Sequence, residues 1–421
     1  MNARTAAVLE VDTEIQTARN AARGILIARS NLRAAATADL MERAQRAAAV
    51  AADHAAAVDA DARLPQEAIA ALRAARLLGV GMPRELGGEG AGIADIADIC
   101  YVLGRACAST AMIYAMHQTN VACLVRHGKS SAWHQLFLRR LGNEQLLLAS
   151  STTEGQGGGD VRNSTAPIER NGALIALERQ ATVISYGGIA DGVVTTARRS
   201  ADATRSDQVL VTFLKQDYTL ESLVGWDAFG MRGTCSEGFK LVASGSQEQI
   251  LPVSYEKIQA QTMMPVAHLL WSAAWTGIAT AAVERARAFV RKAAQRAGGT
   301  LPPAAAHLTR ANATLRTLRS LVASALLRFE AAADDPAALE AIDFQTGMNL
   351  HKVNASELAV AAVMSAMQTC GLSGYRNDGE FSIGRHLRDI LSSPVMISND
   401  RILANIAAAS MLTGAPNSLS D

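Results

Sequence analysis

The sequence has few aromatic residues and almost no charge imbalance. Phe, Trp and Tyr make up 4% of its 421 residues, and the formal net charge is +1. Basic side chains are scattered among acidic ones, so nothing indicates a nucleic-acid partner. Hydrophobic residues reach 49%, enough for a large core, and alanine, the best helix former, is abundant.

Cysteine and histidine do not form the patterns that hold metals or build disulfide frameworks. The five cysteines are an odd number and include no CxxC pair, which indicates reduced, mostly buried thiols. The histidines are dispersed without an HExxH motif, and no GxSxG nucleophile elbow occurs. We therefore expect no metal site.

Long apolar segments are also lacking. The first 32 residues alternate polar and apolar side chains and do not contain the apolar core of a signal peptide. No stretch of the sequence looks apolar over the length needed to span a bilayer. We expect a soluble, cytoplasmic protein without a membrane partner.

What is present divides the chain into a leader and three domains, a multi-domain α+β fold. The middle part carries short β-branched runs bounded by turn residues, and no long helical pattern separates them. The parts are a leader of uncertain structure (1–35), an N-terminal α-helical domain (36–145), a central antiparallel β-barrel domain (146–255) and a C-terminal four-helix bundle (256–421). The bundle helices are expected near 266–297, 302–333, 336–371 and 384–412.

A glycine-rich loop follows the first expected strand, over Thr153–Asp160. Glycine has no Cβ, so its backbone N–H groups can come close to a pyrophosphate. Composition alone favours an ordinary β-turn. The other glycine run, Gly87–Gly92, does not follow a strand of a βαβ unit and indicates a surface loop.

Five short motifs, in this order along the chain, resemble the acyl-CoA dehydrogenase superfamily over roughly residues 40–410. They are Met82–Gly88 for "PxExGG", Thr153–Val161 for "TEPGAGSDV", Gly230–Ser236 for "GMRGTxS", Gln368–Tyr375 for "QxxGGxGY" and Arg385–Asp389 for "RxxRD". The resemblance implies one FAD per subunit between the β domain and the C-terminal bundle, usually in a homotetramer.

The same resemblance implies which residues hold the FAD. A flavin needs polar groups at its ring edge and N–H groups or a guanidinium at its phosphates. The positions are Thr153 at the isoalloxazine edge, Gly158 and Gly159 at the pyrophosphate, Ser185 in place of the threonine of "WIT", Arg296 at a neighbouring subunit's FAD phosphates, and Gln368 and Gly371 at the adenosine half.

The catalytic base of the resembled family is not where the family places it. Dehydrogenation of an acyl thioester needs a carboxylate beside the α-carbon. The family's two glutamate positions are occupied here by Ile397 and Ala267. A displaced base remains open, with Asp400 or His268 as candidates; the alternatives are a helix cap for Asp400 and a solvated helix residue for His268.

Three functions therefore follow from the resemblance. The first is an acyl-thioester dehydrogenase with a displaced base and an electron-transfer flavoprotein as partner. The second is a monooxygenase that uses reduced flavin and O₂, with a flavin reductase as partner and FMN as a possible cofactor; His117 is its candidate residue. The third is a non-catalytic descendant.

Overall fold

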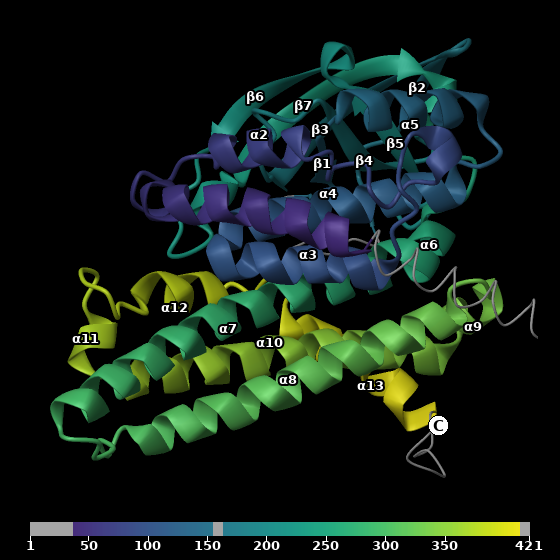
Figure 1. The fold of residues 1–421 in the computed structure, drawn as a ribbon. Helices are drawn as coiled ribbons and strands as arrows, with labels where there is room; N and C mark the ends of the chain where they lie inside the picture. Colours follow the sequence, from purple (N-terminus) through teal and green to yellow (C-terminus); the bar gives the residue numbers. More distant parts are fainter. Residues whose placement is uncertain (1–36, 155–162, 413–421) are drawn as a thin grey trace, which may run out of the picture.

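The computed structural model describes residues 37–154 and 163–412. Two layers are visible in Figure 1. The first layer holds the amino-terminal helices and the strands, and the second holds the long carboxy-terminal helices α7, α8 and α10. Helical amino- and carboxy-terminal parts around a central β region confirm the coarse fold prediction.

The amino-terminal part consists of helices joined by short turns. They are the helix 37–60, α2 (Gln66–Ala74), α3 (Ile93–Ala106), α4 (Ala108–His127) and α5 (Ala132–Glu144). Helix α4 carries no charged residue before its last turn, and most of its residues are buried. A helix without a charged face is usually covered on all sides, and α4 lies against α3, α7 and strand β1 (Leu148–Ser151).

Two separate sheets form the β region. One has the order β1-β4-β5 and the other β2-β3-β7-β6. The remaining strands are β2 (Glu169–Asn171), β3 (Leu174–Ile184), β4 (Gly192–Arg198), β5 (Gln208–Leu214), β6 (Tyr218–Val224) and β7 (Glu237–Ser246).

The prediction of an antiparallel barrel is wrong in two respects. Strands β1 and β4 pair in parallel, although the other described strand pairs are antiparallel. The parallel pair arises because the chain crosses to the second sheet after β1 and returns to the first through β4. The two sheets also do not join into a closed barrel among the described strands.

Three long helices dominate the carboxy-terminal part. These helices, α7 (Met264–Arg296), α8 (Ala305–Ala332) and α10 (Ile342–Cys370), pack against one another. The shorter elements are α6 (Tyr255–Ile258), the π-helical η5 (Gln259–Met263), α9 (Pro336–Glu340), α11 (Leu372–Tyr375), α12 (Gly384–Ile390) and α13 (Asn399–Leu412).

The expected single helix 384–412 is wrong, because turns separate α12 from α13. Pro394 cannot donate a helical hydrogen bond, and Ile397 adopts a left-handed conformation with φ 50°. The expectation about apolar segments also needs correction. The helical stretch Tyr255–Arg296 is long and apolar enough to cross a membrane, but 94% of its most apolar window is buried inside the protein, as in a core helix.

Helices α3 and α7 approach each other at two glycines. A Cβ on Gly277 would overlap the carbonyl oxygen of Tyr101, and a Cβ on Gly104 would overlap that of Ala274. Gly277→Ala is therefore expected to lower the free energy of unfolding by about 1–3 kcal/mol, the usual cost of overpacking. Chemical denaturation measures the change. Gly188→Ala is the control, because a Cβ there meets nothing within 4 Å, and an equal loss in both variants would contradict the packing argument.

Candidate functional site

The segment Gly230–Ser236 is where the three parts of the chain meet. A Cβ on Gly230 would overlap the main chain of Arg388, and a Cβ on Gly233 would overlap Val58. The glycines are thus needed for close approach of the β region to both helical parts.

Asp389 links α12 to this segment by a hydrogen bond. Its Oδ1 accepts a hydrogen bond from the backbone N of Met231 at 2.7 Å. Burial raises the pKa of Asp389 to about 6. The neighbouring Arg388 forms an ion pair with Asp59 of the first described helix. The "RxxRD" motif therefore links the carboxy-terminal part to the other two.

A chain of hydroxyl groups lies beside this junction. Ser185 Oγ lies 2.7 Å from Ser236 Oγ, which lies 2.8 Å from Thr234 Oγ1. Thr234 Oγ1 donates to the carbonyl of Met231 at 2.8 Å. A hydroxyl has one proton, so Ser236 donates to Thr234 and Ser185 donates to Ser236. Ser185 is half-buried and directly follows β3. Its hydroxyl oxygen can therefore accept a hydrogen bond from a further group.

The base of the glycine-rich loop is clamped by one carboxylate. Glu154 accepts hydrogen bonds from Ser164 Oγ at 2.6 Å, from Thr165 N at 2.7 Å, and from the Thr165 hydroxyl. A bridge between Glu154 and Ala181 places the preceding Thr153 beside β3, the strand that ends just before Ser185. Gly158 and Gly159 lie outside the described residues.

Arg179 is the counter-charge of this carboxylate. Its Nη1 lies 3.6 Å from Glu154 Oε1, and its side chain is fully buried. Burial lowers the pKa of Arg179 to about 10. Burial alone would raise the pKa of Glu154, but the hydrogen bonds from Ser164 and Thr165 and the arginine charge hold it below its usual range.

Sequence reasoning missed this pair, although a signal was present. Ile175, Leu177, Arg179 and Ala181 alternate with outward-facing residues of β3 and are all buried. An arginine at an inward position of a strand needs a buried partner.

His117 and His268 are both core residues. His117 Nε2 lies 2.9 Å from the carbonyl of Leu78, and His117 Nδ1 accepts from the backbone N of Leu148 at 3.1 Å. Both its ring nitrogens thus serve the main chain, and burial lowers its pKa to about 4. This geometry favours a structural role over the predicted oxygenation role. His268 lies 3.2 Å from the carbonyl of Met348, and burial lowers its pKa to about 3, so the solvated position considered for it is wrong.

The positions of the family's glutamate carry no acid. Ala267 is buried in α7. Ile397 precedes α13, and its carbonyl oxygen accepts a hydrogen bond from Lys352 Nζ at 2.8 Å. Asp400 is exposed in the first turn of α13, where an acid is favoured by the helix dipole. Of the two candidate bases, Asp400 is thus exposed and His268 is enclosed in the core, and a role as base stays a prediction for both.

The residues expected at the FAD phosphates of a neighbouring subunit and at the adenosine half lie at the carboxy-terminal ends of α7 and α10. Arg296 is the last residue of α7, and Gln368 lies in the last turn of α10; both are exposed. Gly371 ends α10 with φ 55° and ψ −135°, a conformation open mainly to glycine. The roles of Arg296 at a neighbouring subunit and of Gln368 and Gly371 at the adenosine half stay predictions.

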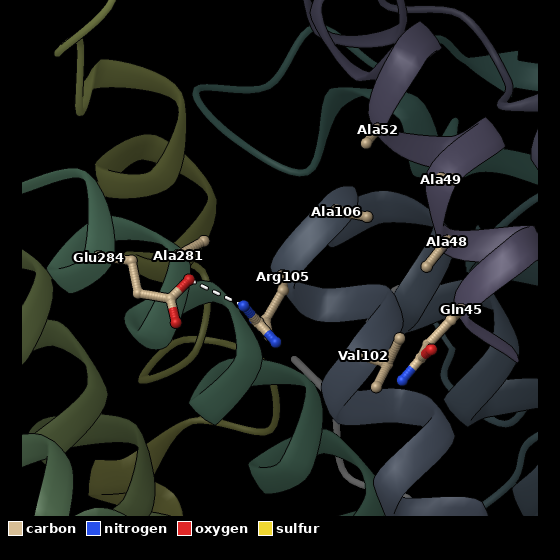
Figure 2. A pocket seen from close by; sticks show the side chains of 9 residues that line it. All are labelled: Gln45, Ala48, Ala49, Ala52, Val102, Arg105, Ala106, Ala281 and Glu284. Carbon is tan, nitrogen blue, oxygen red and sulfur yellow. Dashed lines mark hydrogen bonds and ion pairs between the residues drawn. The ribbon is translucent and has the colours of Figure 1, made fainter. Parts of the chain in front are cut away.

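A hollow of about 290 Å³ lies elsewhere, between the first described helix, α3 and α7 (Figure 2). Alanines make up most of its lining, and an ion pair between Arg105 and Glu284 spans 2.8 Å at its side. None of the predicted site residues lines it. The candidate site is therefore the junction around the hydroxyl chain.

The sequence matches known families at both helical parts. Residues 36–144 match "Acyl-CoA dehydrogenase, N-terminal domain", and residues 258–412 match "Acyl-CoA dehydrogenase, C-terminal domain". Together the two matches cover well over half of the chain.

Curated proteins and solved structures agree with these matches. Cyclohex-1-ene-1-carbonyl-CoA dehydrogenase of Geobacter metallireducens is 26% identical, over 79% of this chain and 86% of that protein. Amino sugar nitrososynthase DnmZ of Streptomyces peucetius is 24% identical, over 80% and 84%. FMN-bound TdsC of Paenibacillus sp. A11-2 superposes with a TM-score of 0.78 at 16% identity, over 90% and 98%. The chain therefore belongs to the acyl-CoA dehydrogenase family of flavoproteins.

Proposed function

We propose that this chain is a flavin-dependent monooxygenase that receives its flavin already reduced, as FMN or FAD, from a separate flavin reductase. Bound reduced flavin supplies the two electrons that, with O₂ and two protons, put one oxygen atom into the substrate and release the other as water. The observation that carries the proposal is the pair of apolar residues, Ile397 and Ala267, at the positions where the family has its glutamate.

The exposed Asp400 and the hydrogen-bonded His268 support the same choice. Removal of an α-proton needs a base within hydrogen-bond reach of that proton. Asp400 points to solvent at the start of α13, and His268 is bound to the Met348 carbonyl inside the core. Oxygenation by reduced flavin does not require an α-proton to leave, so it does not require a base there.

The residues at the junction fit a flavin. Ser185 directly follows β3 and is hydrogen-bonded to Ser236, and Glu154, which follows Thr153, bridges Ala181 of the same strand. Because the Ser185 proton is used by Ser236, Ser185 offers an acceptor. An acceptor suits an N–H of a reduced flavin ring, whereas the bare ring nitrogen of an oxidised flavin wants a donor. This difference favours the reduced form as the state that binds.

Acyl-thioester dehydrogenation is the second candidate. It is favoured by the similarity to cyclohex-1-ene-1-carbonyl-CoA dehydrogenase over most of both chains. In that case electrons would leave through an electron-transfer flavoprotein. A homotetramer is proposed for either function, because the family resemblance implies a homotetramer in which Arg296 would reach the flavin phosphates of a neighbouring subunit.

Transfer of an oxygen atom from O₂ to a substrate distinguishes the two functions. With chemically or enzymatically reduced FMN or FAD supplied, we expect a panel of amines, amino sugars and aromatic heterocycles to include compounds that gain one oxygen atom from ¹⁸O₂ in the presence of the protein. The measurement is mass spectrometry of the product. Ser185→Ala removes the acceptor. We expect it to lower the affinity for reduced flavin more than the affinity for oxidised flavin, each compared with the unaltered chain. Failure of every compound to take up label, with normal flavin binding, would count against oxygenation.

A further inference from the structure

Lys352 is a buried amine without a carboxylate beside it. Its side chain is fully buried in the middle of α10, and among the described residues it takes part in no ion pair. Burial lowers the pKa of Lys352 to about 8 against the opposing charge of Glu357, which is exposed on the next turn of α10. Such an amine costs more to bury than an apolar side chain of the same length, so packing alone does not explain it.

The amine is bound at two points of one short segment. Lys352 Nζ lies 2.8 Å from the carbonyl oxygen of Ile397 and 2.7 Å from Asn399 Oδ1. It also lies 5.8 Å from the ring centre of Trp275, on α7. The charge of Lys352 also contributes to lowering the pKa of His268, on α7. The lysine thus joins α10 to the segment that leads into α13.

The segment it holds is conformationally unfavourable. Ile397 has φ 50°, a left-handed conformation that β-branched residues rarely adopt. Such a residue persists when its surroundings determine it strongly. Asn399 supplies further bonds, because its backbone N donates to the carbonyl of Pro394 at 2.9 Å and its Nδ2 donates to Ser356 Oγ at 3.0 Å.

We propose that Lys352 is a positioning residue: its amine fixes the main chain at Ile397 and so sets the pocket wall at the position where the family carries its glutamate. The inference rests on the proposed function, since it takes Ile397 to face the flavin and the substrate. Lys352 itself touches neither in this arrangement, because its hydrogen-bond donors are directed to Ile397, Asn399 and the face of Trp275.

Hydrogen exchange of the protein without flavin tests the anchor. We expect Lys352→Met, which keeps the length but removes the amine, to raise the exchange rate of the amides in 391–399 at least tenfold. The amides of α7 and the first half of α10 should keep their rates. Asn399→Ala, which removes one of the two acceptors, should give a smaller rise in the same segment and serves if Lys352→Met does not fold. Unchanged exchange of 391–399 in the folded variant would overturn the proposal.

Iodide quenching of bound-flavin fluorescence tests whether the anchored segment is the pocket wall. Lys352→Met is expected to increase the quenching constant several-fold at unchanged flavin stoichiometry, and Arg105→Met, which breaks a distant exposed ion pair, should not change it. Faster exchange without altered quenching would overturn the assignment of this segment to the pocket. If the unaltered protein binds no flavin, the proposed function fails and the pocket role of Lys352 fails with it, whereas the exchange result still decides whether the anchor exists.

Discussion

Replacing Glu154 by alanine is expected to lower the free energy of unfolding by about 3–5 kcal/mol, the cost of leaving a buried charge without its partner. Arg179 is fully buried, and its remaining hydrogen bonds go to Thr196. The variant also removes the acceptor of Ser164 and Thr165. Urea denaturation followed by circular dichroism measures the change.

A neighbouring acid provides the matched control. Glu178 precedes Arg179 on β3 and pairs with Lys240 at 2.9 Å, but its side chain is 63% exposed. Exposed ion pairs contribute about 0–1 kcal/mol, so Glu178→Ala should change little. Flavin affinity is a second readout, because Glu154 closes the loop expected to hold the pyrophosphate. Equal stability of the two variants would show that the buried pair does not hold the loop base.

Acid is expected to unfold the protein between about pH 6.5 and pH 4. Burial is the largest cause that lowers the pKa of six histidines, to between about 3 and about 4. These residues are His117, His127, His134, His268, His351 and His386. In the unfolded chain they take up protons near pH 6.5, so unfolding gains protons and stability falls as the pH falls through this window.

The effect is expected to be large. A pKa difference of one corresponds to about 1.4 kcal/mol, so a histidine whose pKa falls from about 6.5 to about 4 costs roughly 3 kcal/mol of stability at low pH. A few such residues equal the roughly 5–15 kcal/mol of a typical domain. Asp389 and Asp98 act in the opposite direction, because burial raises the pKa of both carboxyls and the folded state binds their protons first. Two carboxyls against six histidines leave a net loss of stability at low pH.

A single substitution isolates the contribution of one histidine. Neither ring nitrogen of His351 has a hydrogen-bond partner among the described residues. His351→Leu should therefore be about as stable as the unaltered chain at pH 7 and more stable than it at pH 5. Thermal midpoints across this range measure the difference. A midpoint that stays level from pH 7 to pH 4 in the unaltered protein would contradict the assignment of buried neutral histidines.

The helices and the coarse arrangement could be predicted because periodic apolar patterns extend over many residues. The break between α12 and α13 could not, since it depends on Ile397 taking a left-handed conformation that its own side chain disfavours. The parallel pairing of β1 with β4 also escaped prediction, because it depends on the order in which the chain visits two sheets.

The candidate site was predictable where motifs mark it and not where tertiary contacts make it. Ser185 was expected from its motif position, but its link through Ser236 to Thr234 joins residues about fifty positions apart. Lys352 has no motif, although it lies one turn after the buried Met348 on the inward face of α10. A basic residue on an apolar stripe was the available signal. His117 was predicted as the residue for oxygenation, whereas in the structure both of its ring nitrogens are hydrogen-bonded to main-chain groups.

Anaerobic mixing with acyl-CoA thioesters tests the central claim most directly. The protein is loaded with oxidised FAD or FMN, and its visible absorbance is followed after addition of short-chain, long-chain, branched and alicyclic acyl-CoAs without O₂. Because Ile397 and Ala267 supply no base, we predict that none of these thioesters bleaches the bound flavin. Rapid bleaching by any of them, lost in an Asp400→Asn or His268→Gln protein, would show that a displaced base works and would contradict the account.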